Sequence, residues 1–274
     1  MSELAAEHEA PELSIVLPAH NEVTLLGSTV TNLTTGLDER SRSYEIVIVE
    51  NGSHDGTLRL ARLLAAQLPR LRVLTLPAGD YGAALAAGFL AAEGAIVVNF
   101  DVDYYDLAFL DKALELLSNA SCSLVVASKR APGAMDRRPW HRRLVTYVFT
   151  SVLDKVFGMS LSDAHGMKAL RRDDLLTIVQ DCVMTRALFD VELVLRADRA
   201  GLRGAEVPAF VVERRPPRST ITRRSLETIG GLARLALVLR HVPSTPPAGA
   251  EDRRRHAPEV VQARLSRLSN WRRS

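Results

Sequence analysis

The sequence predicts an α/β fold, with a mostly parallel β-sheet flanked by helices and a basic C-terminal helical extension. Two observations carry this prediction. Over the first half of the chain, short apolar runs alternate four times with segments of helical pattern. Each apolar run ends in a polar loop that contains glycine, proline, asparagine or aspartate. Since ligands bind at the carboxyl ends of strands in such sheets, we expect the functional residues in these loops.

The apolar pattern defines the strands and helices of the first half in chain order. Runs rich in valine, isoleucine and leucine predict strands, and longer segments that begin after a turn predict helices. We expect strands at residues 13–17, 44–50, 71–76, 95–100 and 123–128. We expect helices between them at residues 24–37, 58–68, 83–92 and 107–118.

The second half is less regular, and its elements are predicted singly. A basic loop containing glycine and proline leads into a helix that is both apolar and basic, which we expect to belong to the core. In order, we expect a loop at 129–139, this helix at 140–157, a polar loop or short strand at 163–168, a helix at 186–200, a strand at 205–213, a basic loop at 214–224 and an amphipathic helix at 226–242. We therefore divide the chain into a disordered N-terminus (1–12), a domain (13–224), an amphipathic helix (225–243) and a tail rich in proline and arginine (244–274).

The composition excludes several classes of protein. Hydrophobic residues make up 47% and charged residues 24% of 274 residues, as in ordinary globular proteins. The chain contains no apolar run of 18 residues, and residues 1–11 are acidic, so we expect neither a transmembrane helix nor a secretory signal. The two cysteines, Cys122 and Cys182, have no disulfide or metal spacing and are expected to pack in the core. These features predict a cytoplasmic protein.

The net charge of +3 is unevenly distributed along the chain. Residues 214–274 contain 14 arginines and four acidic residues, a net charge of +10, which leaves −7 for residues 1–213. A basic C-terminal part favours an anionic partner, which could be a phosphorylated substrate, an anionic membrane surface or nucleic acid. Nucleic acid is the least favoured of these, because Trp271 is the only Phe, Tyr or Trp residue in this part.

Asp101 and Asp103 follow the fourth expected strand, where its carboxyl end should lie. In an extended chain, side chains two residues apart point the same way, and two such carboxylates repel each other unless a cation lies between them. Oxygen ligands of this kind suit Mg²⁺ or Mn²⁺ that also binds phosphates. A solvated acidic loop is the alternative for so short a motif. The polar loops at 18–22, 50–57 and 79–82 are expected at the same edge, and they favour the metal site.

In this order and spacing, the motifs resemble family 2 glycosyltransferases of the GT-A (Rossmann-like) fold. Within that family they are most similar to dolichyl- and polyprenyl-phosphate mannose synthases. The resemblance extends from about residue 13 to residue 224. Its parts are LSIVLPAHNE at 13–22, EIVIVENGSHDGT at 45–57, GAAL at 82–85 with Gly88, DVD at 101–103, residues 162–172, FDVE at 189–192 and EVP at 206–208.

The resemblance implies a nucleotide-sugar site in the loops after the first four strands. Asp101 and Asp103 would hold the metal, Mg²⁺ or Mn²⁺, against the diphosphate of the donor. The residues implied to bind the donor are Pro18, Ala19, Glu22, Glu50, Asn51, Gly52, Asp80, Tyr81, Ala84, Asp101, Val102, Arg214 and Ser219.

The sequence departs from the family pattern at three places in this site. Glu50-Asn51 stands where many relatives have two aspartates, which leaves the identity of the base open. Tyr105 stands where the lipid-phosphate synthases often have a glutamine ligand, and a phenol is a poor ligand for a hard cation. Pro217 and Thr220 replace a glycine and a lysine of the loop that closes on the diphosphate.

The resemblance also implies a site for the phosphate of the acceptor. Lys129 stands where relatives have an arginine, and it supplies a point charge in place of a bidentate fork. Arg130 is adjacent and would share this role. Arg142 or Arg143 would add a second contact to the phosphate.

The implied reaction is a metal-dependent, inverting transfer of a sugar, with mannose from GDP-mannose as the expected donor, onto a polyprenyl phosphate. A phosphate is already ionised at pH 7 and needs no strong general base, whereas a hydroxyl acceptor needs one. The candidate bases are Asp163, His165, Asp190 and Glu192. Asp190 and Glu192 lie two residues apart on an expected helix, so at most one points into the site, and we favour Asp190. Asp103, Asp163 and Asp190 are therefore the expected catalytic residues.

Two alternatives remain open. One is a family member that uses UDP-glucose or another donor with a soluble or protein hydroxyl acceptor. The other is a nucleotide-sugar-binding relative without turnover, which the departures at Tyr105, Pro217 and Thr220 favour. For the main hypothesis we expect a peripheral protein at the cytoplasmic face of a membrane, with a membrane-protein partner or a second copy as compatible partners. The segment at 226–242 would then either pack on the domain or lie on the membrane.

Overall fold

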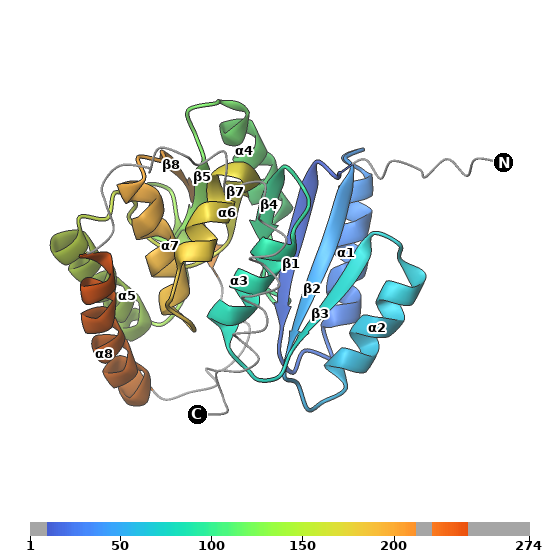
Figure 1. Cartoon of the computed structure of the whole chain (residues 1–274), viewed down its shortest axis with the longest axis horizontal. Coiled ribbons are helices and arrows are strands. Elements are labelled where there is room, and N and C mark those ends of the chain that lie inside the picture. Colours follow the sequence, from blue (N-terminus) through green and yellow to red (C-terminus); the bar gives the residue numbers. More distant parts are fainter. Residues whose placement is uncertain (1–9, 212–220, 241–274) are drawn as a thin grey trace.

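A computed structural model describes residues 10–211 and 221–240, with only the backbone described for residues 221–229. Strands and helices alternate strictly over residues 13–128 and less regularly beyond them (Figure 1). The expectations for the first nine residues, for Arg214, Pro217, Ser219 and Thr220, and for the tail at 244–274 lie outside the described residues.

A seven-stranded sheet of order β3-β2-β1-β4-β7-β5-β8 forms the centre of the domain (Figure 1). All neighbours pair in parallel except β7, which is antiparallel to both β4 and β5. The α/β fold with a mostly parallel sheet is thus confirmed. The strands are β1 (Leu13–Ala19), β2 (Tyr44–Asn51), β3 (Leu71–Leu76), β4 (Ile96–Asn99), β5 (Leu124–Ser128), β7 (Lys168–Arg171) and β8 (Gly204–Pro208).

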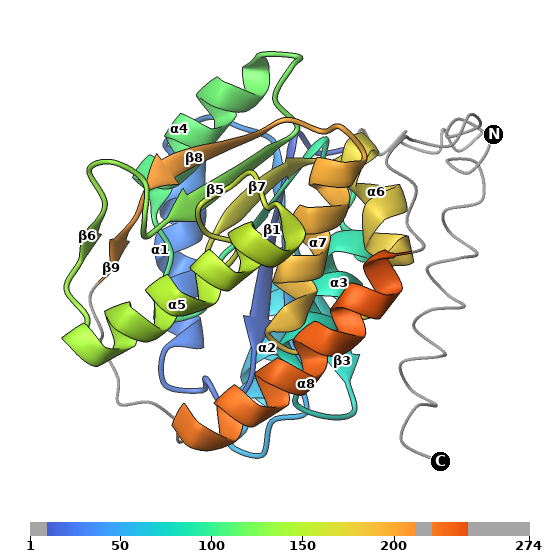
Figure 2. The same cartoon turned by 90° about the vertical axis from the view of Figure 1, so that its left-hand side faces the viewer.

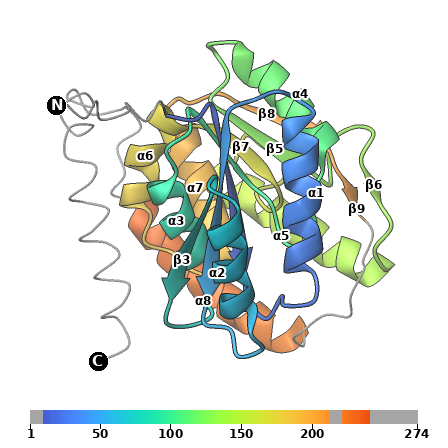
Figure 3. The ribbon, with the colours of Figure 1, turned by 90° about the vertical axis from the view of Figure 1, so that its right-hand side faces the viewer.

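Helices cover both faces of this sheet, so its central strands are buried on both sides (Figure 3). The alternating residues Ile15 and Val16 of β1 belong to different core clusters, one on each face. One face is covered by α1 (Leu26–Asp38), α2 (Thr57–Gln67) and α4 (Leu107–Ser118). The other is covered by α3 (Tyr81–Ala91), α6 (Arg172–Asp181) and α7 (Leu188–Arg199).

Helix α3 approaches its neighbours closely because it is built of small residues. Every residue from Gly82 to Leu90 is buried. A Cβ at Gly82 would lie 2.5 Å from the carbonyl oxygen of Arg186, and one at Gly88 would lie 2.3 Å from Cγ1 of Val16. Gly82 therefore lets the N-terminus of α3 meet the loop before α7, which places the start of α3 at the candidate site, and Gly88 lets the helix lie close against β1.

Several expected boundaries in the second half are wrong. The expected strand at 205–213 is divided at Ala209 into β8 and β9 (Phe210–Val211), and β9 pairs with an unexpected short strand, β6 (Met135–Asp136). Helix α6 was not expected. Helix α8 (Ile221–Leu239) begins inside the segment that was expected to be a basic loop. The polar segment at 163–168 is a loop that ends in the first residue of β7.

Helix α5 (Trp140–Phe157) lies across the outside of the domain on the same side as α8 (Figure 2). It was expected to belong to the core, yet Trp140 is 73% exposed, and only Thr150 and Leu153 of this helix are buried. Phe149 and Phe157 are partly buried against the core. The sequence pattern misled here because apolar residues occur on nearly the whole circumference of α5. Within the described ranges, no helix is long and apolar enough to cross a bilayer.

Candidate active site

The loops after β1, β2 and β3 are joined by hydrogen bonds at the carboxyl edge of the sheet. Ala19 at the end of β1 lies beside Glu50 at the end of β2. The backbone N–H of the half-buried Asp80, after β3, donates to Oδ1 of Asn51 at 2.9 Å. The backbone N–H of Glu22 donates to Oγ1 of Thr57 at 2.8 Å. These contacts bring the residues expected to bind the nucleotide to one place.

The turn after β2 has a fixed shape. Oε1 of the buried Glu50 accepts the backbone N–H of Ser53 at 2.6 Å. Gly52 has a φ of +65°, and a Cβ there would lie 2.7 Å from the Cα of Ala78. A side chain at this position is therefore both strained and blocked. Glu50 holds the turn as well as being implied to meet the base.

Asp80 and Tyr81 link the start of α3 to two other parts of the site. Oδ1 of Asp80 accepts the backbone N–H groups of Ala83 and Arg186, at 2.9 and 2.8 Å. The hydroxyl of Tyr81 donates to Oδ1 of Asp101 at 2.9 Å. Ala84, in the first turn of α3, is buried. The structure thus gives both polar residues a role in holding the loops together.

Asp101 and Asp103 lie in a tight turn, so the expectation of an extended Asp-x-Asp is wrong. The backbone N–H groups of Asp101 and Tyr104 each donate to the carbonyl oxygen of the other, at 3.0 and 3.1 Å. Strand β4 has already ended at Asn99. Val102, at the tip of the turn, is buried. The turn, rather than the alternation of a strand, therefore sets the positions of the two carboxylates.

The carboxylates around Asp101 are close enough to affect one another. The pKa of Asp101 is raised to about 6; burial is the largest cause, Asp103 and Asp190 add to it, and the Tyr81 hydrogen bond opposes it. Carboxylates crowded in this way suit a hard divalent cation. Within the described part of the chain, no group of three or more His, Cys, Asp or Glu residues could hold a metal ion. The two carboxylates fit part of the coordination sphere of such a cation, which would take its other oxygens from a bound diphosphate and water.

Tyr105 contacts α1. Its hydroxyl accepts a hydrogen bond of 2.9 Å from Nδ2 of Asn32 in α1. Its ring lies against Phe100, with the ring centroids 6.4 Å apart. Tyr105, which departs from the family pattern, is therefore held in place by Asn32 and Phe100.

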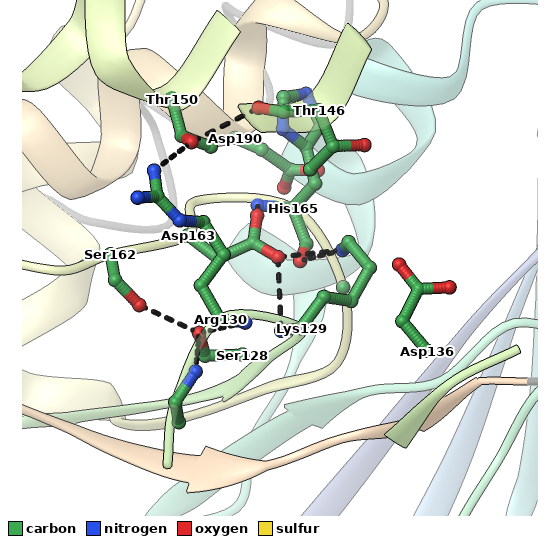
Figure 4. Close-up of polar contacts among 12 residues, drawn as sticks. Ser128, Lys129, Arg130, Asp136, Thr146, Thr150, Ser162, Asp163, His165 and Asp190 are labelled. Atoms are coloured by element: carbon green, nitrogen blue, oxygen red, sulfur yellow. Dashed lines mark hydrogen bonds and ion pairs between the residues drawn. The ribbon is translucent and has the colours of Figure 1, made fainter. Parts of the chain in front are cut away.

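Lys129 forms a buried ion pair with Asp163 (Figure 4). Its Nζ lies 2.8 Å from Oδ2 of Asp163 and also donates to the carbonyl oxygen of His165 at 3.0 Å. Burial acts to raise the pKa of Asp163, but the Lys129 ammonium and the hydrogen bonds from Lys129 and His165 outweigh it, so this pKa is lowered. Asp163 is fully buried. A carboxylate held in this way is a poor proton acceptor.

Arg130 is held by helix α5 (Figure 4). Its Nη1 donates to Oγ1 of Thr150, and its guanidinium lies 4.8 Å from the ring centroid of Tyr147. Arg143 precedes these two residues by four and seven positions, which places it on the same side of the helix. Arg142 is in the same first turn of α5. The four cations expected to bind the acceptor phosphate therefore belong to α5 or to the loop against it.

Asp190 and Glu192 point to different places. Oδ1 of Asp190 lies 2.8 Å from Nζ of Lys168, a fully buried lysine at the start of β7. Glu192 accepts the backbone N–H groups of Val183 and Met184 and pairs with Arg196 at 2.8 Å. Glu192 therefore stabilises the connection between α6 and α7.

His165 lies between Asp163 and α7. Burial is the largest cause that lowers its pKa. Nε2 lies 3.1 Å from the carbonyl oxygen of Ala187, so a neutral ring donates its proton there. The ring also packs against Phe149 of α5, with centroids 5.4 Å apart.

Sequence reasoning missed Lys168, Tyr147 and Thr150. The signal for Lys168 is a lysine in the apolar stretch Met167–Leu170, where a buried charge requires a partner. Tyr147 and Thr150 carry no such signal, because their roles depend on where α5 packs.

Several known proteins are similar to this chain in sequence. Residues 14–179 match the sequence model of Glycosyl transferase family 2. The chain is 29% identical over 211 residues to glycosyltransferase AglD of Haloferax volcanii, covering 74% of this chain but 34% of that protein. It is 30% identical over 207 residues to undecaprenyl-phosphate mannosyltransferase of Micrococcus luteus, covering 73% and 83%. It is 29% identical over 209 residues to a dolichyl-phosphate beta-glucosyltransferase of Trichomonas vaginalis, covering 72% and 64%.

Among solved structures, the chain resembles glucosyl-3-phosphoglycerate synthase of Mycobacterium tuberculosis, crystallised with Mn²⁺, UDP and phosphoglyceric acid. The TM-score is 0.58 and the identity 23%, over 87% of this chain and 81% of that one. At this sequence identity, the similarity shows a shared fold.

Proposed function

Because this chain belongs to glycosyl transferase family 2 and is a glycosyltransferase, we propose that it transfers mannose from GDP-mannose to a polyprenyl phosphate. The observation that carries the acceptor class is the pairing of two candidate bases with lysines. Asp163 pairs with Lys129, and Asp190 with Lys168, both at 2.8 Å. Neither carboxylate is suited to remove a proton from a hydroxyl.

A phosphate acceptor removes the need for such a base. Its oxygen is ionised at pH 7 and can attack the anomeric carbon directly, which inverts the configuration there. Burial is the largest cause that lowers the pKa of His165, which weakens this residue as a base. The chemistry that remains for the protein is to bind, orient and balance charge.

The acceptor phosphate would bind between Lys129 and Arg130, with Arg142 or Arg143 as an outer contact. Lys129 is pre-oriented by Asp163, and Arg130 by Thr150 and Tyr147. Two cations fixed in this way screen the charge of the acceptor phosphate. Without them, the donor diphosphate would repel the acceptor phosphate.

The donor would lie across the loops after β1 to β4. Asp101 and Asp103 would hold Mg²⁺ or Mn²⁺, which, when bound, stabilises the charge of the leaving diphosphate. Tyr81 orients Asp101 through its hydrogen bond. Glu50, Asn51 and Gly52 form the turn implied to meet the base, and Arg214 and Ser219 are proposed to meet the diphosphate from outside the described residues.

Two relatives support the choice of acceptor, and they differ in the sugar. One is named as an undecaprenyl-phosphate mannosyltransferase and covers most of this chain. Another is named as a dolichyl-phosphate beta-glucosyltransferase. UDP-glucose is therefore the second candidate donor.

We propose that the protein binds the cytoplasmic face of a membrane through helix α5. Its outer side exposes apolar residues over most of its length, and the basic residues His141, Arg142, Arg143 and Lys155 are on the same helix. Such a surface suits an anionic bilayer. The exposed apolar residues of α5 are Trp140, Leu144, Val145, Tyr147, Val148, Val152 and Val156.

A matrix of donors and acceptors tests the proposal. GDP-mannose and UDP-glucose are each offered with undecaprenyl phosphate, dolichyl phosphate and glycerate 3-phosphate, with Mg²⁺ or Mn²⁺. We expect mannose on the polyprenyl phosphates and no transfer by Asp103→Ala. Transfer only to glycerate 3-phosphate, or to no acceptor despite donor binding, would refute the proposed acceptor.

A further inference from the structure

Lys168 is a charged side chain enclosed beneath the candidate site. It is fully buried, at the first position of β7. Its backbone N–H donates at 3.1 Å to Oδ1 of Asn99, the last residue of β4, and Asn99 precedes Asp101 by two residues. Lys168 therefore lies at the edge of the sheet where the donor site is built.

The ammonium of Lys168 has two partners. Nζ lies 2.8 Å from Oδ1 of Asp190 and donates to the carbonyl oxygen of Gly166 at 2.9 Å. Asp190 belongs to the first turn of α7 and is 2% exposed. The pair thus connects β7 to α7 across the floor of the site, and both of its charges are withdrawn from water.

A buried ion pair contributes little net stability, because the loss of hydration of both ions offsets their attraction. Its location suggests another reason for Lys168. Its backbone is bonded to Asn99, two residues before Asp101, and its ammonium holds Asp190 of α7. Lys168 thus fixes the carboxylate of α7 relative to the strand that leads to Asp101 and Asp103.

We propose that Lys168 is a positioning residue for sugar transfer, which fixes the carboxylate of Asp190 at the edge of the sheet where the donor site is built. This inference rests on the proposed function, because sugar transfer is the reaction whose kinetics are measured. Lys168 acts through Asp190 alone in this role. Its removal should therefore slow the chemical step and leave the binding of donor and acceptor largely unchanged.

The chain offers a matched control on the same helix. Arg196 and Glu192 form a second buried pair at 2.8 Å, and Glu192 is directed to the connection before α7. Arg196→Met removes the cation that pairs with a buried carboxylate, as Lys168→Met does, but from a pair whose carboxylate is bonded to the connection before α7. It should lower the melting temperature and leave kcat within about twofold of wild type.

The experiment measures kcat and KM for Lys168→Met, Asp190→Asn and the double variant, with the donor and acceptor that the wild type uses best. We expect kcat of Lys168→Met to fall at least tenfold, with both KM values within about threefold. We expect the double variant to be no more than about twofold slower than the slower single variant, because the two residues act as one unit.

Three results would overturn the proposal. One is a kcat for folded Lys168→Met within twofold of wild type. Another is a double variant whose loss equals the product of the two single losses. The third is an equal loss of kcat in Arg196→Met. If Lys168→Met does not fold, the charge-balanced double variant is compared with Asp190→Asn, and a further tenfold loss contradicts the proposal. The wild-type activity on polyprenyl phosphate, measured alongside, tests the proposed function separately.

Discussion

The hydroxyl of Tyr81 donates a 2.9 Å hydrogen bond to Asp101, and this contact ties the start of α3 to the turn after β4. It also opposes the burial that raises the pKa of Asp101. Tyr81→Phe should therefore weaken the binding of a divalent cation at Asp101 about tenfold at pH 7, since a hydrogen bond to a charged group contributes about 1.5–3 kcal/mol. Titration of activity with Mn²⁺ measures this shift, and an unchanged half-saturating concentration would exclude the proposed role of Tyr81.

The stability of the metal-free protein should depend on pH through Asp101. Its pKa is about 6 in the folded protein, and that of an unfolded aspartate is about 4. The folded carboxyl therefore keeps its proton where the unfolded one loses it. The stabilisation is complete below about pH 4 and is lost as the pH rises through about 6, a change of about 1–3 kcal/mol.

Asp101→Asn provides the measurement of that effect. The variant cannot ionise at this position, so its melting temperature should exceed that of wild type at pH 7.5 in EDTA, and the difference should vanish near pH 4. A difference that does not change between these pH values contradicts the raised pKa.

Substitutions of Lys129 and Arg143 should differ in their effect on stability, although both should weaken acceptor binding. Lys129→Met leaves the fully buried Asp163 without its ion-pair partner, which we expect to cost about 3 kcal/mol of unfolding free energy and to raise KM for the acceptor. Arg143→Ala, at an exposed position, should raise the same KM about threefold without a change in stability. Chemical unfolding and acceptor kinetics are measured for both. An unchanged acceptor KM in both variants would rule out this phosphate site.

Gly52→Ala should damage the nucleotide end of the site. The residue would have to keep a φ of +65° with its Cβ 2.7 Å from the Cα of Ala78. We expect a loss of about 1–3 kcal/mol in stability and a higher KM for the donor, with the acceptor KM unaffected. Gly27→Ala, where a Cβ would meet nothing within 4 Å, is the control. Equal stability of the two variants would show that the turn tolerates a side chain.

Membrane contact should depend on α5 more than on α8. Leu144 in α5 and Leu237 in α8 are 52% and 58% exposed, so the same change to glutamine removes a similar exposed side chain from each helix. We expect Leu144→Gln to reduce flotation with vesicles of phosphatidylcholine and phosphatidylglycerol, and Leu237→Gln to have little effect. Loss of dimerisation instead of flotation would identify α5 as a contact between copies of the chain.

The sequence was sufficient to predict the helices and strands that have a clear local pattern of apolar residues. The strand at 71–76 and the helices at 107–118 and 140–157 were expected at their observed bounds. Strand β7 has four residues, begins with Lys168 and is antiparallel to its neighbours, so neither length nor apolar pattern revealed it. The exposure of α5 was also hidden, because an apolar circumference does not say which side another element covers.

The loops of the site were predictable, but their internal partners were not. Four polar segments at strand ends were enough to predict that the loops after the first four strands lie at one edge of the sheet. The pairing of Lys168 with Asp190 joins residues 22 positions apart, on β7 and α7, and depends on how those elements pack. The turn at Asp101–Tyr104 depends on two backbone hydrogen bonds that an apolar pattern does not encode.

In the proposed reaction the acceptor is a phosphate, and the paired Asp163 and Asp190 do not act as bases. The most direct measurement offers the enzyme GDP-mannose with polyprenyl phosphate and, separately, with the polyprenol of the same chain length. We predict mannose on the phosphate and none on the alcohol, with rates that stay constant above the pH at which the phosphate is ionised. Transfer to the alcohol at a comparable rate, lost in Asp163→Asn or Asp190→Asn, would contradict the account.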